Sequence, residues 1–357
     1  STCRAIFKEH YYIKASKARK SVNALFGAEN FVGTIPPLAG ISVYMAAVDP
    51  HLMSACDVSV DIDPTLLMQL ERIQKLFLRR LLGVAKWSPV APLFTETGTW
   101  PIKYRRIMLA LRYWQYALSL PSDHYLSHAF AESVTLARLK KSSWLSDLAR
   151  VLADLHRPVH MDLSRPWAPL DIEAIIAAVE QSCLADMDAY LAVSPKTPLL
   201  QHRSCQHAGD LLQKRVLCSF RAYLNVPIPA HRKAVVQLLS SSHTLAIEVL
   251  RWSERRQPPL PRSQRLCRYC QTEVEDEVHA LWCCRALSKL HNLRRSFFVD
   301  VFALAPAAFL SDLHSAPSAL HVTRLFVDTE ESAVLCRFAK FVFDILRVYK
   351  EVPVLRS

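Results

Sequence analysis

Residues 63–83 read DPTLLMQLERIQKLFLRRLLG and carry the clearest secondary-structure signal in the chain. Apolar side chains recur at the spacing of a helical face, and charged side chains fill the opposite face. The apolar set is Leu66, Leu67, Leu70, Ile73, Phe77 and Leu81, and the charged set is Glu71, Arg72, Lys75, Arg79 and Arg80. Asp63-Pro64 matches an N-cap followed by Pro at the first helical position, and Gly83 matches a C-terminal stop. We therefore predict an amphipathic helix over residues 65–82.

The rest of the chain extends this helical pattern. Only 6 residues are Gly and 21 are Pro. Few glycines disfavour tight hairpins and phosphate-cradling loops, and many prolines between apolar stretches suggest helices separated by breaks. The predicted fold class is mainly α. Further helices are predicted at 4–27, 39–48, 101–116, 171–193, 202–223, 231–241, 244–251 and 331–349, with two more inside 123–155, a turn at Asp49-Pro50 and linkers at 156–169 and 194–198.

Length and charge restrict the class of protein. A chain of 357 residues suggests two or three structural units, and 51% apolar residues suffice for a large core. The net charge of +12 favours a polyanionic partner, of which nucleic acid is the commonest.

No apolar run is long enough to span a membrane and no signal peptide opens the chain, so we expect no membrane partner and an intracellular location, in nucleus or cytoplasm. The start at Ser1, without Met, fits a fragment of a longer protein.

A cysteine-rich segment at residues 267–284 reads CRYCQTEVEDEVHALWCC and holds four of the chain's ten cysteines. Cys267 and Cys270 have the C-x2-C spacing with which two thiolates grip one zinc ion, and a later His and Cys can complete a tetrahedral set. His279 is the third predicted ligand. An i, i+4 pairing on a helix face favours Cys283 as the fourth, whereas Cys284 at i, i+5 needs a bend. The alternative is a set of cysteines buried in a helical core.

Such a site would be structural, because four protein ligands leave no open position for water or substrate. The loop between the ligands is acidic, with Glu273, Glu275, Asp276 and Glu277. An acidic loop does not itself lie on phosphate, so any nucleic-acid contacts near the module must come from flanking arginines. Those arginines are Arg251, Arg255, Arg256, Arg262, Arg265 and Arg268.

Three stretches together resemble a known family. They are residues 12–15 with 32–37 and 49–50; residues 70–83 with 95–98, 101 and 104–106; and residues 265–270 with 279–284. In this order they resemble the region after the palm in reverse transcriptases of non-LTR retrotransposons, particularly fungal ones. The resemblance covers most of residues 10–120 and 220–290, and residues 125–200 match only weakly.

The resemblance implies three regions with different roles along the chain. Residues 1–120 would form a thumb-like helical region, 121–200 a helical connector, and 201–357 a C-terminal helical region containing a Cys-Cys-His-Cys (CCHC) zinc module at 267–284. The family's spacing places four residues between His and the last Cys, which favours Cys284. The same family holds its catalytic metals on adjacent aspartates, and this sequence contains no Asp-Asp pair. Asp61-Ile62-Asp63 comes nearest, and we interpret it as a capped turn.

We therefore predict a non-catalytic, zinc-stabilised, nucleic-acid-binding segment. Its partners would be RNA or DNA, either an RNA–DNA hybrid or target DNA, together with the upstream polymerase palm of the same polyprotein. The predicted nucleic-acid contacts are Lys75, Arg79, Arg80, Arg105, Arg106, Arg255, Arg256, Arg265 and Arg268. The alternatives are a helical protein-interaction scaffold and an inactive remnant of a mobile element. A complete enzyme is disfavoured by the missing carboxylates.

Overall fold

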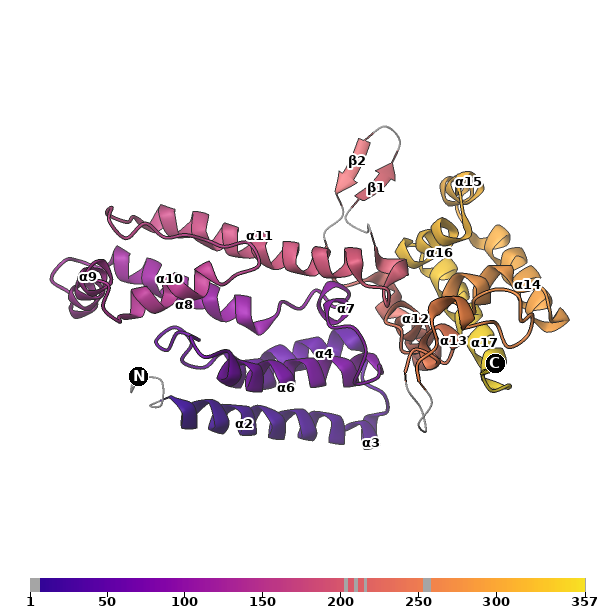
Figure 1. Cartoon of the computed structure of the whole chain (residues 1–357), viewed down its shortest axis with the longest axis horizontal. Helices are drawn as coiled ribbons and strands as arrows, with labels where there is room; N and C mark the ends of the chain where they lie inside the picture. The colour runs from indigo at the N-terminus through magenta and orange to yellow at the C-terminus, as the bar shows by residue number, and fades with distance from the viewer. Residues whose placement is uncertain (1–6, 202–204, 209–210, 215–216, 253–257, 357) are drawn as a thin grey trace.

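The computed structural model describes residues 7–201, 205–208, 211–214, 217–252 and 258–356. These residues are mainly helical, as predicted, with one short hairpin (Figure 1). The α-helices are α2 (Lys8–Gly27), α3 (Glu29–Val32), α4 (Pro37–Val43), α5 (Asp49–Met53), α6 (Pro64–Leu82), α7 (Ala91–Thr95), α8 (Ile102–Ser119), α9 (Tyr125–Arg138), α10 (Trp144–Ala153), α11 (Pro169–Val193), α12 (Pro229–Leu239), α13 (Ala246–Val249), α14 (Ser288–Leu304), α15 (Ala307–Ser315), α16 (Ala319–Asp328) and α17 (Ser332–Lys350). The shorter elements are η1 (Tyr44–Val48), η2 (Pro198–Leu200), η3 (Ala222–Asn225), η4 (Arg262–Gln264), η5 (His279–Cys283), β1 (Cys205–Ala208) and β2 (Leu211–Lys214).

The helix predicted from residues 63–83 forms as α6, with both of its predicted ends. The Asp63 carboxylate caps it by accepting a hydrogen bond from the Thr65 backbone N–H at 2.8 Å. Gly83 ends it in the left-handed conformation, at φ 68°. The apolar face of α6 packs on α2, and the two helices lie side by side in Figure 1. The ring of Phe77 meets Phe26 of α2 at a centroid distance of 5.3 Å and Tyr44 at 4.8 Å.

A buried ion pair ties this layer to α8. The Arg106 guanidinium donates to both oxygens of Asp61, at 2.6 and 2.7 Å, and both side chains are at most 5% exposed. The Tyr11 hydroxyl of α2 donates to the same carboxylate. Asp61 thus anchors two helices, a tertiary role that the interpretation as a capped turn did not include. Asp63 alone plays the capping role.

The segment from Thr95 to Gly98, one of the stretches that carry the resemblance, has a structural role. Thr97 forms an isolated antiparallel bridge with Phe220. Gly98 has φ 69°, and a Cβ added to it would lie 2.8 Å from the Phe220 backbone nitrogen. Only glycine meets both demands, since it tolerates positive φ and lets another backbone approach closely. Glu96 is also buried and accepts a hydrogen bond from the Tyr223 hydroxyl at 2.5 Å, so this loop joins the N-terminal helices to the segment after the hairpin.

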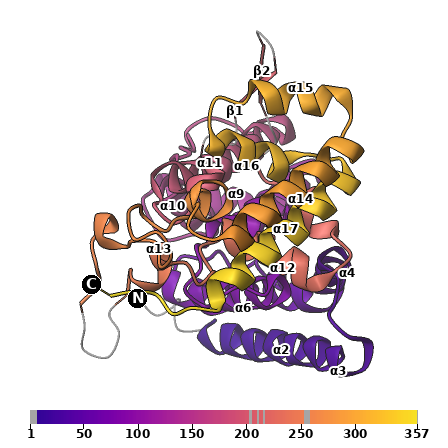
Figure 2. The same cartoon turned by 90° about the vertical axis from the view of Figure 1, so that its right-hand side faces the viewer.

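The C-terminal helices gather around α17, at the right-hand end of Figure 1. α17 packs against α12, α14 and α16 and lies beside α12 and α14 in the side view (Figure 2). An aromatic cluster fills this interface. The rings of Phe297 and Phe341 stack at 4.4 Å, those of Phe326 and Phe338 at 5.3 Å, and Trp282 lies 5.1 Å from Phe341. The Cys/His segment at residues 267–284, which contains Trp282, therefore rests on a large apolar core.

Two predictions of local structure are wrong. The helix predicted over 202–223 is replaced by the antiparallel hairpin β1–β2, in which Ala208 pairs with Leu211, and by the short turn η3. The turn predicted at Asp49-Pro50 is absent, because a π-helical turn joins α4 to α5 without a break. Its wider ring, closed by the Asp49 N–H on the Tyr44 carbonyl, accommodates a Pro that supplies no N–H. Across the described ranges, every helix is too short or too polar to cross a membrane.

We predict that Asp61→Ala lowers the free energy of unfolding by about 3–5 kcal/mol, because it leaves the Arg106 charge buried without its partner. Urea denaturation followed by circular dichroism measures this loss. The matched control is Glu173→Ala, which removes a half-exposed carboxylate 3.9 Å from Arg112 and should change stability little. Equal losses in the two variants would contradict the anchoring role of Asp61.

Candidate metal centre

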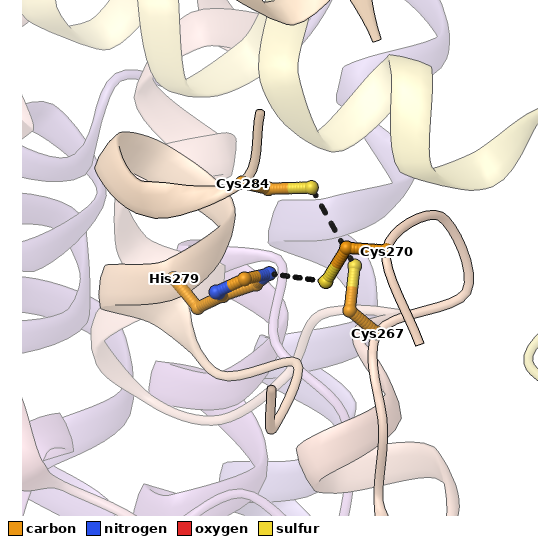
Figure 3. A group of neighbouring side chains, drawn as sticks. All are labelled: Cys267, Cys270, His279 and Cys284. Carbon is orange, nitrogen blue, oxygen red and sulfur yellow. Dashed lines mark hydrogen bonds between the residues drawn. The ribbon is translucent and has the colours of Figure 1, made fainter. Parts of the chain in front are cut away.

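The first half of the Cys/His cluster is a tight knuckle. An isolated antiparallel bridge pairs Leu266 with Val274, and the Cys267 N–H donates to the Glu273 carbonyl at 2.8 Å. The chain turns back between them through Gln271, which has φ 57°. The Gln271 N–H donates to the Cys267 carbonyl at 2.9 Å, which closes the turn. This geometry presents the Cys267 and Cys270 thiols on one side of the turn, as Figure 3 shows.

The second half is the π-helical turn η5, which selects between the two predicted fourth ligands. The Cys284 N–H donates to the His279 carbonyl at 3.0 Å, a hydrogen bond between residues five positions apart. A π-turn therefore brings residue i+5, not i+4, back beneath the histidine. Cys284 is buried and belongs to the cluster, whereas Cys283 is exposed. The geometry supports Cys284, as the family spacing implies, and not the argument from a regular α-helix.

Two of the separations among the four ligand atoms match those around one tetrahedral ion. The sulfurs of Cys267 and Cys284 are 3.7 Å apart, and the Cys270 sulfur is 3.5 Å from His279 Nε2 (Figure 3). All four atoms lie within 4.8 Å of one another. Tetrahedral zinc with bonds of about 2.3 Å to sulfur and about 2.0–2.1 Å to nitrogen requires separations of about 3.8 and about 3.5 Å. The group can therefore hold a metal ion, and its donor set is compatible with zinc.

A carboxylate outside the ligand set orients the histidine. Glu273 lies 2.7 Å from His279 Nδ1, on the ring edge opposite the cysteines. If Nδ1 carries the proton and donates to Glu273, the Nε2 lone pair points toward Cys270 and the ion position. Metal-bound histidines usually have such a carboxylate or carbonyl partner, which fixes the tautomer. This contact is a further observation that fits a metal.

The pKa values of the two knuckle thiols, Cys267 and Cys270, shift in opposite directions. Burial raises the pKa of the Cys267 thiol to about 12. Burial also raises the pKa of Cys270, but hydrogen bonds from the Thr272 side chain and backbone and from the Glu273 N–H outweigh it, and the pKa falls to about 6. The lowered pKa favours the thiolate form of Cys270, whereas an ion must displace a proton from Cys267.

Two arginines hold the module against the rest of the protein. Arg268 is buried and pairs with the fully buried Glu275 at 2.6 Å. It also donates to the carbonyls of Thr244, Tyr349 and Val352, and so joins the knuckle to the end of α17. Arg294 of α14 donates to three carbonyls of the second half of the cluster, those of Ala280, Leu281 and Cys284.

Two of the four acidic residues in the loop are buried. Glu275 and Glu277 are buried, Glu277 in contact with His243 at 2.9 Å. Sequence reasoning missed both roles, since an acidic run in a loop has the composition of a solvated face. Their partners make burial of these carboxylates tolerable: His243 for Glu277, and the Arg268 guanidinium with the backbone N–H groups of Ala246 and Arg268 for Glu275.

The predicted nucleic-acid contacts separate into three groups. Arg106 and Arg268 are buried in ion pairs, so their guanidinium groups cannot reach a phosphate, and we remove both from the contact set. Five others have partners inside the protein. Lys75 and Arg105 pair with the carboxylates of Glu71 and Asp49. Arg79 donates to the Ser88 carbonyl, Arg265 donates to the Leu260 and Ile247 carbonyls, and exposed Arg80 lies over the Phe26 ring. Arg255 and Arg256 lie outside the described residues.

No protein-family model, curated protein or solved structure matches the chain.

We expect one zinc ion per purified chain, and loss of that ion in Cys284→Ser but not in Cys283→Ser. The two adjacent cysteines make this a matched pair, because only Cys284 lies in the cluster. Elemental analysis of the purified variants measures the stoichiometry. Equal retention of zinc in both variants, or loss only in Cys283→Ser, would overturn the ligand assignment.

The Tyr349 hydroxyl, buried in α17, lies 3.8 Å from the Cys267 sulfur. We predict that Tyr349→Phe weakens zinc binding by about 10–100-fold, the usual cost of losing a hydrogen-bonding partner outside the ligand set. Competition with a chelator measures the affinity. Tyr269→Phe is the control, since the Tyr269 hydroxyl donates to the Val348 carbonyl and not to a thiol. Unchanged affinity in Tyr349→Phe would contradict the role.

Proposed function

We propose that the chain is a non-catalytic, nucleic-acid-binding part of a non-LTR retrotransposon reverse transcriptase, stabilised by zinc. The three stretches that resemble that family suggest its place after a polymerase palm, which would be its intramolecular partner. RNA, DNA or an RNA–DNA hybrid would be the ligand. The proposal treats residues 1–120 as thumb-like and the metal module as a structural clamp.

The observation that carries the proposal is the surplus of positive charge left after internal pairing. The chain has a net charge of +12, and several of its carboxylates are used inside the protein, as Asp61 and Glu275 are. Exposed cations such as Lys17, Arg19 and Arg72 have no carboxylate partner among the described residues. A surface of this sign attracts polyanions and releases their counterions on binding.

Two features support a non-catalytic role. The metal cluster offers four protein ligands, and a four-coordinate zinc has no position for a substrate. Asp61, in the Asp-x-Asp stretch that comes nearest to a polymerase motif, has both oxygens bound by Arg106. In this arrangement Asp61 neutralises an arginine and is not offered to a metal ion.

A second candidate is a helical protein-interaction scaffold, which an exposed apolar group favours. Phe31 and Val32 of α3 are 91% and 73% exposed, and Leu38 of α4 is 55% exposed. The three lie within eight residues of one another along the chain, and grouped exposed apolar side chains commonly mark a protein contact. An inactive remnant of a mobile element would keep the same fold without either activity.

Binding of the zinc-loaded chain to an RNA–DNA hybrid distinguishes these functions. We expect binding that is tight at low salt and, if about six phosphates are neutralised, weaker by about 10³-fold between 50 and 200 mM salt. Fluorescence anisotropy with a labelled hybrid measures it across a salt series. Absence of binding at low salt by the folded, zinc-loaded chain would exclude the nucleic-acid function and leave the scaffold or the remnant.

A further inference from the structure

The positive charge of the chain is concentrated on two neighbouring helices. α2 and α6 together carry nine lysine and arginine side chains and two glutamates, a net formal charge of +7. The whole chain has a net charge of +12. Thus 39 residues of 357 hold more than half of the surplus. Since α2 and α6 pack together, their fields add over one region of the surface.

The packing of the two helices shows which cations lie near their seam. The Arg80 guanidinium of α6 lies 4.3 Å from the centroid of the Phe26 ring of α2, so Arg80 leans across the seam. Arg19 precedes Phe26 by seven residues, or two helical turns, and lies along the same side of α2. Arg72 belongs to the row of α6 that ends at Arg80, spaced i, i+4, i+8 with Leu76.

The cations of this region are available to a ligand. Arg19 of α2 and Arg72 and Arg80 of α6 are exposed, and Lys17 and Lys20 are exposed on the side of α2 that faces away from Phe26. Within the described part of the chain none of the five has a carboxylate partner: Arg72 donates to the Met68 sulfur, and Arg80 lies over the Phe26 ring. By contrast, Arg105 and Arg106 of α8 are paired with Asp49 and Asp61. Charge alone in the sequence does not separate these two groups.

We propose that the α2–α6 basic surface, defined as Lys17, Arg19, Lys20, Arg72 and Arg80, binds the phosphate backbone of a nucleic acid. This inference rests on the proposed function and places its main contacts on α2, which supplied none of the predicted contact residues. Flexible lysines and forked arginines on exposed helix faces meet phosphates as point charges and bidentate donors. The surface recognises the charge and shape of the nucleic acid and not the identity of its bases, since its contacts go to the phosphate backbone.

The experiment compares two triple variants of the full, zinc-loaded chain that remove equal charge. Lys17→Gln, Arg19→Gln and Lys20→Gln are combined in the test variant. Lys141→Gln, Arg150→Gln and Arg157→Gln are combined in the control, at exposed sites around α10 that also have no ion pair among the described residues. Glutamine retains helix propensity, so folding should persist in both variants. Circular dichroism and zinc content verify this before binding is measured.

The expected result is a change in the salt dependence of binding. Each phosphate that the protein no longer neutralises lowers the slope of log affinity against log salt by about 0.9 for duplex DNA, so the slope should fall by up to about 3 in the test variant and by nearly nothing in the control. Equal decreases in the two variants would overturn the assigned surface but leave nucleic-acid binding intact. Failure of the unmodified chain to bind would instead refute the proposed function. The two failures are therefore distinguishable.

Two further comparisons identify which nucleic acid supplies the phosphates and test the contribution of α6. An RNA–DNA hybrid, a DNA duplex and single-stranded RNA of equal length are titrated with both variants. Weaker binding of all three supports backbone recognition without strand preference, and weaker binding of one alone assigns the surface to that form. Arg72→Gln tests α6 independently, because the polar contact of Arg72 is with Met68 of the same helix. An unchanged salt slope in Arg72→Gln would restrict the surface to α2.

Discussion

Buried guanidinium groups tie this protein together, and two of them are each matched by a buried carboxylate. An unpaired charge in the interior is far more costly than the pair, so the chain has to bring the partners together when it folds. Arg106 with Asp61 fixes α8 against the loop before α6 and, through Tyr11, against α2. Arg268 with Glu275 fixes the metal knuckle and, through the carbonyls of Tyr349 and Val352, the end of α17. The N-terminal layer and the metal module are thus positioned by the same kind of constraint.

Two π-helical turns solve local problems that a regular α-helix could not. The turn η1 carries the chain from α4 into α5 across Asp49-Pro50, and it leaves Asp49 buried and paired with Arg105. The turn η5 brings Cys284 into line with His279 through a hydrogen bond that spans five residues. Each wider turn changes which residue faces the interior by one position. In the second case that single position separates a member of the Cys/His cluster from an exposed thiol.

The arginines of this protein have two kinds of role, distinguished by whether the guanidinium has acceptors inside the protein. Arg106, Arg268 and Arg294 donate to carboxylates and carbonyls that close helix ends and join distant segments. The cations of the α2–α6 basic surface lie at the exterior without such acceptors, which suits them to an external polyanion. The proposed function, binding of a nucleic acid without chemistry, assigns a structural role to the first group and ligand contacts to the second.

The sequence by itself determined the elements whose signals are local. The α6 helix with its Asp63 and Gly83 ends, the pair α9 and α10, and the cluster of Cys267, Cys270 and His279 all follow from periodicity, capping and ligand spacing. Only the tertiary structure decided between Cys283 and Cys284, since the π-turn that selects Cys284 depends on how the module packs. It also decided that Glu275 and Arg106 are buried while Arg80 is exposed. Composition records how many charges a chain carries, but their partners often lie tens of residues away along the chain, and only folding brings them into contact.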